Sequence, residues 1–445
     1  MRIQLSDHFG YRHLLKFTLP SIAMMIFTSI YGVVDGFFVS NFAGKTSFAA
    51  VNLIMPFLMI LGTVGFVFGT GGSAIVAKTL GEGKGELANR YFSLFVYFSL
   101  GISIVIAALG IIFIKEISVL LGAEGEMLLC CIDYGRIILA ALPCFVLQLE
   151  FQSFFVTAEL PQMGLFVTVA SGVTNMVLDA LLVTLFPAEY KLIGAALATA
   201  FSQAVGGIVP LIFFLRSKRG IISLGKTRLY GRAIIKACVN GSSEFMSNIS
   251  MSLVGILYNF QLMKHVGEDG IAAYGVMMYV SMIFAAAFIG YSIGSAPIIG
   301  YHDGAGNNAE LRGILARSLI IIGSLSLAML ALSEALAYPL SLIFVGYDEV
   351  LLALTVRGFR IFSFSFLFMG FAIFSSGFFT ALNDGVTSAL ISFLRTLVFQ
   401  AAAVLLIPIW LGVDGIWLSI VVAELMAVVL SVIFLIIKTK RFRKS

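Results

Sequence analysis

The sequence predicts an all-α integral membrane protein with twelve transmembrane helices in two pseudo-symmetric six-helix lobes. Three observations lead to this fold class. The 445 residues are 60% hydrophobic and only 11% charged, with a mean hydropathy of +1.04. Apolar runs of about 20 residues, the length that crosses a bilayer, recur along the whole chain. Two sequence patterns of the first half also return in the second half at a nearly constant offset.

The low charge content excludes an ordinary soluble protein. A soluble domain carries about a quarter charged residues, so this chain must place most of its surface in lipid. The net charge of +5 comes from loops between apolar runs and does not indicate a nucleic-acid partner. The four cysteines and four histidines lack the spacing of a zinc site or a disulfide framework, so no metal centre or cofactor is expected.

Each apolar run is expected to form one membrane helix. The expected spans are residues 14–40, 48–78, 90–115, 127–156, 162–187, 192–216, 234–263, 271–301, 310–345, 349–379, 384–411 and 415–438.

The lysines and arginines fix the expected orientation of these spans. Twenty of them fall in segments on the side of the N-terminus, and four fall in the loops of the other side. Because cytoplasmic loops carry the excess of positive charge, both termini are expected in the cytoplasm, as an even number of spans requires.

The two halves resemble each other. "GGSAIVAKTLGEGKGEL" (71–87) returns as "GSAPIIGYHDGAGNNAEL" (294–311), and "SFFVTAEL" (153–160) returns as "GFFTALND" (377–384). The separation of Gly72 from Gly294 along the chain is nearly the same as that of Phe154 from Phe378. A near-constant offset at two places indicates an internal duplication.

The duplication divides the chain at its one long basic connection. We expect an N-lobe over residues 1–216, a cytoplasmic linker over 217–233 and a C-lobe with a basic tail over 234–445. Six spans per half give two repeats of equal orientation, related by an axis along the membrane normal. Two such lobes around a cavity are typical of an alternating-access transporter. A large scaffold without transport activity is the alternative.

Two carboxylates lie deep in the apolar runs of the N-lobe, where each costs about 3 kcal/mol on insertion scales. They belong to polar pairs four residues apart, Tyr31 with Asp35 and Asn175 with Asp179, and such pairs share a helix face. Thr199 on the sixth span is expected at a similar depth. With no lysine or arginine at this depth, these side chains predict an oxygen cage for a small hard cation or a shared-proton pair. A structural role for the carboxylates is the alternative.

A second group of residues is expected to line the substrate cavity. Glu244 lies in the polar stretch "NGSSEFMSNIS", and methionines suit walls that accept varied ligands. The candidates are Glu244, Gln152, Glu150, Met24, Met246 and Gln203. By contrast, Arg395 is expected to pair with an acid or a carbonyl, and Glu334 and Glu424 are interpreted as structural.

These features resemble the multidrug and toxic compound extrusion (MATE) family. The resemblance covers nearly the whole chain, with twelve spans, two lobes, a basic central loop and paired "GSA…G…G…EL" segments. Tyr31 with Asp35, and Asn175 with Asp179, match the cation-binding pattern of the family's N-lobe, and Thr199 matches its hydroxyl. The stretch "NGSSEF" is similar to the MepA-like bacterial branch.

The resemblance implies a multidrug efflux antiporter that exports lipophilic, often cationic drugs or toxic compounds in exchange for H⁺ or Na⁺, and that confers antibiotic resistance. It also implies a monomer in the bacterial cytoplasmic membrane. The tenth span lacks the acid that another branch places there, so coupling through the C-lobe is not expected. A flippase for lipid-linked saccharides is the alternative, although the N-lobe offers acids instead of phosphate-binding bases. No catalytic motif predicts an enzyme, and uptake remains open because the coupling gradient sets the direction.

Overall fold

A computed structural model describes residues 3–42, 44–187, 190–216, 221–438 and 440. Within these ranges the chain is helical, with no β-strand. Parts of the expected linker and basic tail, at 217–220, 439 and 441–445, lie outside the described residues.

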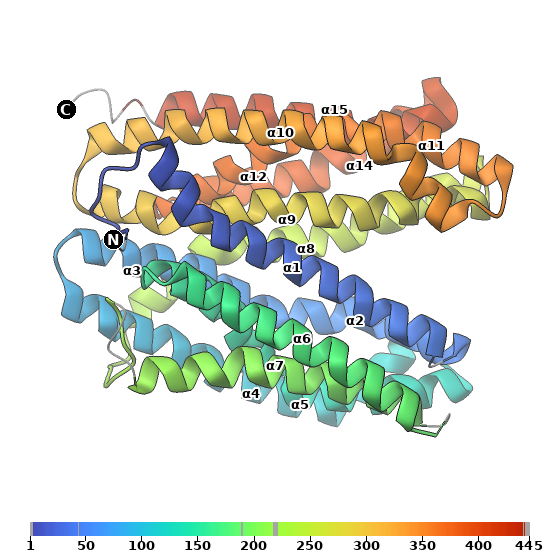
Figure 1. The fold of residues 1–445 in the computed structure, drawn as a ribbon, viewed down its shortest axis with the longest axis horizontal. Helices are drawn as coiled ribbons and strands as arrows, with labels where there is room; N and C mark the ends of the chain where they lie inside the picture. The colour runs from blue at the N-terminus through green and yellow to red at the C-terminus, as the bar shows by residue number, and fades with distance from the viewer. Residues whose placement is uncertain (1–2, 43, 188–189, 217–220, 439, 441–445) are drawn as a thin grey trace.

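The first half forms one helical lobe, drawn in blue and green in Figure 1. Its second span is a series of three segments, because a π-helical stretch interrupts the α-helix. The elements of this half are α1 (Tyr11–Phe42), α2 (Lys45–Phe66), η1 (Val67–Gly72), α3 (Ser73–Gly81), α4 (Gly85–Leu120), α5 (Gly125–Thr157), α6 (Pro161–Leu185) and α7 (Lys191–Arg216).

The second half forms the other lobe, drawn in yellow to red. Its tenth span is bent by 44° between α11 and α12, and its eleventh span carries another π-helical stretch. The elements are α8 (Gly231–His265), α9 (Glu268–Gly304), α10 (Asn308–Val345), α11 (Glu349–Ser363), α12 (Ser365–Ala381), α13 (Gly385–Phe393), η3 (Leu394–Phe399), α14 (Gln400–Leu406) and α15 (Pro408–Lys438).

The expected spans correspond to these helices, and the differences have physical causes. Many helices extend beyond the predicted ends, because a helix keeps its backbone hydrogen bonds after it leaves the hydrocarbon. The break between the last two spans falls at Gly412, whose φ of +57° suits a residue without Cβ. Ten described helices, or eleven spans with the bent pair α11–α12, are apolar enough to cross a bilayer. Helix α8 is not among them, because polar residues over 240–248 lower its hydropathy.

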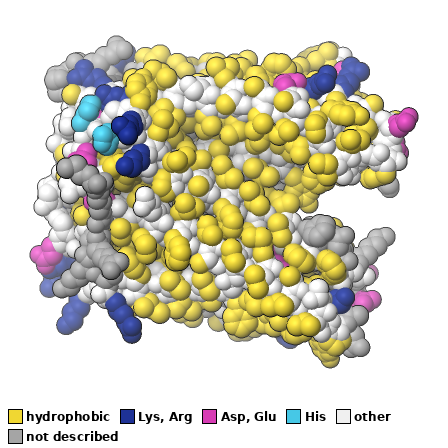
Figure 2. Space-filling view, in the orientation of Figure 1, with side chains coloured by type: hydrophobic (Ala, Val, Ile, Leu, Met, Phe, Trp, Pro, Cys, Tyr) yellow, Lys and Arg dark blue, Asp and Glu magenta, His cyan; other side chains and the backbone are white. Residues whose placement is uncertain are grey.

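The two lobes meet at one end of the molecule. Both α1 and α15 have their terminal ends there, on the left of Figure 1. Lys78 of the N-lobe forms an ion pair with Asp303 of the C-lobe at 2.7 Å, and Asn383 Nδ2 of the C-lobe donates to the backbone oxygen of Ala74 in the N-lobe at 3.3 Å. At the opposite end the space-filling surface is hollowed between the lobes (Figure 2). The structure is therefore closed at the end that carries the termini and open at the other.

The segment before α1 also contacts both lobes. The Leu5 amide donates to Glu159 of the N-lobe at 2.7 Å, and the Phe9 amide donates to Glu310 of the C-lobe at 2.9 Å. Leu5 and Phe9 are fully buried. This segment therefore adds a third connection to the closed end, besides the Lys78–Asp303 ion pair and the hydrogen bond of Asn383.

Candidate functional site

The carboxylates of Asp35 and Asp179 meet inside the N-lobe. Helix α1 packs along α6, which brings the two side chains within hydrogen-bonding reach of each other. Thr199 on α7 donates to Asp35 Oδ1 at 3.2 Å. Asp179 is fully buried, whereas Asp35 is partly exposed. Three helices thus contribute to one cluster, which we call the N-lobe carboxylate site: Asp35, Asn175, Asp179 and Thr199.

This site has more acceptors than donors. Both Asp179 oxygens and Asn175 Oδ1 are buried without a hydrogen-bond partner among the described residues. No described lysine or arginine forms an ion pair with either carboxylate. Two facing carboxylates repel each other, and an unsatisfied buried acceptor costs about 1–3 kcal/mol. A shared proton or a small hard cation bound by oxygen atoms would remove both penalties, so the residues fit such an ion.

Tyr31 belongs to an adjoining hydrogen-bond network. Gln148 Nε2 lies 3.4 Å from the Tyr31 hydroxyl and 3.3 Å from Ser171 Oγ. Ser171 in turn donates to the backbone oxygen of Ser202 at 2.7 Å. The network joins α1, α5, α6 and α7 directly beside the carboxylates. The network therefore holds these four helices together beside the carboxylates, and Tyr31 is one of its members.

The sequence prediction missed several members of this environment. Ser171 lies four residues before Asn175, which in turn lies four before Asp179. This spacing puts all three on one face of α6, so Ser171 could have been predicted from the sequence. Gln148 lies four residues before the predicted Gln152. Tyr134 is buried close enough to both carboxylates to feel their charge, while its hydroxyl donates to Met55 Sδ at 3.8 Å. It had no such signal, because a tyrosine in an apolar run is usually packing.

Four of the predicted cavity residues lie inside the N-lobe: Glu150, Met24, Gln203 and Gln152. Glu150 is fully buried and accepts a hydrogen bond from Ser99 on α4. Met24 is buried against Gly164 of α6. Gln203, on α7, is nearly buried, and its Oε1 has no partner among the described residues. Their role in binding substrate stays a prediction.

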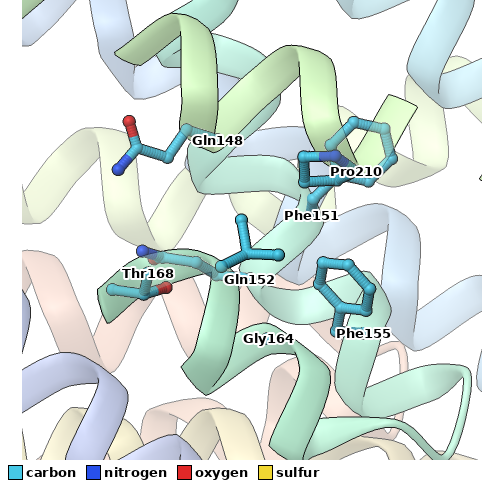
Figure 3. Close-up of a pocket in the computed structure, with 9 residues that line it drawn as sticks. Gln148, Phe151, Gln152, Phe155, Gly164, Thr168 and Pro210 are labelled. Carbon is cyan, nitrogen blue, oxygen red and sulfur yellow. The ribbon is translucent and has the colours of Figure 1, made fainter. Parts of the chain in front are cut away.

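Gln152 borders a small cavity between α5, α6 and α7, where it extends toward Thr168 (Figure 3). Both polar atoms of its amide lack a partner within the described chain. The cavity measures about 10 Å³, the minimum that admits one water molecule. In this conformation it has room for a water molecule, not for a drug.

Glu244 and Met246 lie on α8 and are half-buried. Glu244 is close enough to feel the charge of Arg395 on η3. Arg395 itself holds Glu424 of α15 with two nitrogens, at 2.8 Å from Nε to Oε2 and 2.9 Å from Nη2 to Oε1. The prediction that Arg395 pairs with an acid is confirmed. Glu334 accepts a hydrogen bond from Ser363, which agrees with a structural role.

The duplication and the fold agree with one known family. The MatE family model matches residues 20–181 and 245–405, which is more than half of the chain, with one match in each half. The chain belongs to the MatE family. The resemblance predicted from the motifs is thereby confirmed, as is the internal duplication, since each match covers most of one lobe of this MatE protein.

Relatives and solved structures are similar over most of this MatE chain. Multidrug export protein MepA of Staphylococcus saprophyticus is 24% identical over 416 residues, 93% of this chain and 91% of the relative. MepA of Staphylococcus haemolyticus is 26% identical over 294 residues, 66% and 64% of the two chains. The crystal structure of MATE in complex with MaL6 has a TM-score of 0.92 at 21% identity and covers 98% of both chains. The outward-facing conformation of a multidrug resistance MATE family transporter has a TM-score of 0.92 at 22% identity, also over 98% of both. The predicted fold class is confirmed.

Proposed function

We propose that this MatE protein is a secondary antiporter that exports small lipophilic, often cationic compounds in exchange for H⁺ or Na⁺. The relatives named multidrug export proteins support the substrate class. The observation that carries the coupling mechanism is the N-lobe carboxylate site, with two facing carboxylates and unpartnered oxygens of Asn175 and Asp179. We also propose that it is a monomer in the bacterial cytoplasmic membrane; its long apolar helices and its bacterial relatives support the membrane location.

The closed end is assigned to the cytoplasm and the open end to the outside. The excess of lysine and arginine on the side of the termini supports this orientation. Asp35 lies seven residues before the end of α1, about 10 Å from the open end along the helix axis. Because Asp35 is partly exposed, a cation from outside reaches the site through this side chain first.

Cation binding is coupled to a change in α1. A proton or Na⁺ between Asp35 and Asp179 removes their repulsion and brings α1 and α6 closer together. Helix α1 carries Pro20 in its interior, which removes one backbone hydrogen bond, and Gly32 and Gly36, whose α-carbons have open space around them. Helix α1 also packs along α9 of the other lobe, so its repacking changes the contact between the lobes. Ion binding at the N-lobe carboxylate site can therefore drive the change between outward-open and inward-open conformations.

Replacement of either carboxylate tests the proposal. We expect Asp35→Asn and Asp179→Asn each to lower gradient-driven export of ethidium from proteoliposomes at least about tenfold, because asparagine keeps the shape but cannot take up the coupling charge. A Na⁺ gradient and a pH gradient are imposed in separate experiments, which identifies the coupling ion. Asp133→Asn is the matched control, since this exposed carboxylate on α5 lies outside the site. Wild-type transport by both site variants would refute the coupling role.

A further inference from the structure

A lipid-facing groove on the C-lobe lies away from the proposed transport site. It is bordered by α10 and α15, and α12 packs against both helices and forms its floor. Its volume is about 450 Å³, within the range of small-molecule sites. Leu327 and Val432 on its rims are 60% and 46% exposed. The groove is therefore open to the hydrocarbon that surrounds the helices.

Two hydroxyls in the groove are left without partners. Ser375 of α12 and Ser431 of α15 are 1% and 2% exposed, and neither Oγ has a hydrogen-bond partner among the described residues. Many helical serines of this chain bond to a preceding backbone oxygen, as Ser341 does at 2.6 Å, although Ser21, Ser326, Ser333 and Ser365 also lack a partner among the described residues. Ser375 and Ser431 differ from these four because both line the same groove, where two free donors suit an occupant with acceptor oxygens.

A positive charge lies on the same helix face toward the end that carries the termini. The groove residues of α10 are Leu319, Gly323 and Leu327. They follow Arg312 by about two, three and four helical turns, so all of them lie on the same face of the helix as Arg312. Arg312 is exposed and forms no ion pair with the residues that the structure describes. Lys438 follows Ser431 by about two turns on α15 and shares its charge with Asp384 at 3.1 Å.

The dimensions place this charge at the lipid headgroups. Helix α10 has 38 residues and is about 57 Å long, whereas the hydrocarbon core is about 30 Å thick. Arg312, in the second turn of α10, therefore lies outside the hydrocarbon. Leu319 lies about 10 Å further in, which puts the groove at the depth of the ester groups and upper acyl chain of the same leaflet.

We propose that this groove binds an anionic phospholipid of the cytoplasmic leaflet. An acyl chain lies on α12, the ester oxygens accept from Ser375 and Ser431, and the phosphate is held by Arg312. Moving an acyl chain from bilayer to groove brings no hydrophobic gain, because lipid is as apolar as the groove wall. Selectivity must come from the polar groups. Basic pockets between helices on the cytoplasmic side bind anionic headgroups in this way. The site rests on the orientation assigned above but not on transport activity.

Lipid binding to the purified full-length protein tests the site. In a neutral detergent, phosphatidylglycerol and phosphatidylcholine with identical chains are titrated, and bound lipid is counted by native mass spectrometry. We expect the wild type to prefer phosphatidylglycerol, and Arg312→Gln to reduce that preference about fivefold, the effect of one basic residue near an anionic headgroup. Arg232→Gln, which removes an exposed cation on α8, is the matched control and should leave the preference unchanged.

A second variant tests the acyl-chain position. At Gly323 an added Cβ would meet only the Phe371 ring, at 3.5 Å, so Gly323→Leu fills the groove from a tolerant position. It should lower binding of both lipids, whereas Gly101→Leu on α4, where nothing lies within 4 Å, should not. If Gly323→Leu does not fold, the double variant Ser375→Ala, Ser431→Ala should lower binding of both lipids instead.

Three outcomes would overturn the proposal. An Arg312→Gln variant that keeps the full preference would show that the headgroup binds elsewhere. A Gly323→Leu variant that changes only the oligomeric state would make the groove an interface between two copies. A Gly323→Leu variant that binds both lipids normally but no longer binds ethidium would show that the groove binds substrate instead. Because no transport is measured in the lipid titration, failure of this site leaves the proposed antiport function untouched.

Discussion

At the residue scale, two pairs of charged groups in the membrane differ in kind. Arg395 and Glu424 satisfy each other with charge-assisted hydrogen bonds, and the Glu424 side chain is fully buried. Asp35 and Asp179 are two acids without a basic partner among the described residues. The first pair is complete without a ligand, whereas the second requires one. This contrast distinguishes a structural ion pair from a candidate ion site.

The ion pair leads to a stability prediction. We expect Glu424→Gln to lower the free energy of unfolding by about 3–5 kcal/mol, because it leaves Arg395 nearly buried and without its counter-charge. Unfolding of the purified protein in mixed micelles with increasing dodecyl sulfate measures this change. The exposed pair of Arg357 and Asp414 supplies the control: Asp414→Asn should cost less than about 1 kcal/mol. Equal effects of the two variants would contradict the argument.

At the element scale, the closed end depends on a symmetric crossing of α3 and α9. A Cβ added to Gly81 would lie 1.9 Å from the backbone oxygen of Tyr301. A Cβ added to Gly304 would lie 2.0 Å from that of Lys78. Gly81 and Lys78 correspond to Gly304 and Tyr301 in the internal repeat, so the duplication makes each glycine face the other helix's backbone. Only glycine permits this approach.

Alanine at either glycine is expected to open the closed end. Gly81→Ala and Gly304→Ala force two backbones apart, at a cost of about 1–3 kcal/mol, and so favour the conformation in which this crossing is broken. Spin labels are attached at Lys84 and Ala305 in a variant without native cysteines, and the distance between them is measured by double electron–electron resonance. Opening of the closed end should appear as an additional population with a longer distance. Gly101→Ala, where the new methyl group has open space, is the control. Unchanged distances in both glycine variants would show that the crossing does not control opening.

At the scale of the whole molecule, one helix connects the ion site to the contact between the lobes. Helix α1 packs against α6 beside the carboxylates and against α9 of the C-lobe. The segment before α1 is held by Glu159 on one lobe and Glu310 on the other. A change in α1 at the site is therefore transmitted to both lobes through direct contacts, which is the physical requirement for coupling between ion and substrate.

Coupling through α1 has to be reciprocal, because binding free energies are linked. We expect added Na⁺ or lower pH to weaken binding of ethidium to the purified protein, about 5-fold to 150-fold at saturation, the usual range for linked sites. Asp179→Asn should remove this dependence. Equilibrium dye binding with pH and Na⁺ varied separately measures it, with Asp133→Asn as the control. Affinity that is flat in both variables would make the N-lobe carboxylate site structural.

The helical class, the duplication and the residues of the candidate ion site could all be predicted from the sequence alone. The reason is that the bilayer excludes other backbone structures and makes every buried carboxylate costly, so hydropathy and isolated acids are strong signals. The two MatE matches follow the same repeat that "GSA…EL" revealed. Helix α8 escapes the hydropathy rule, since Glu244 and its polar neighbours interrupt its apolar face.

Which polar groups satisfy one another depends on the tertiary structure. The pairing of Arg395 with Glu424, and the position of Glu150 against Ser99, depend on side chains 29 and 51 residues apart. The packing of the helices also brings Tyr134 near the carboxylates, and it leaves Ser375 and Ser431 without partners in the described chain. Helical periodicity places a residue on a face of its own helix but does not say which helix covers that face. Only the packing of the helices settles that choice.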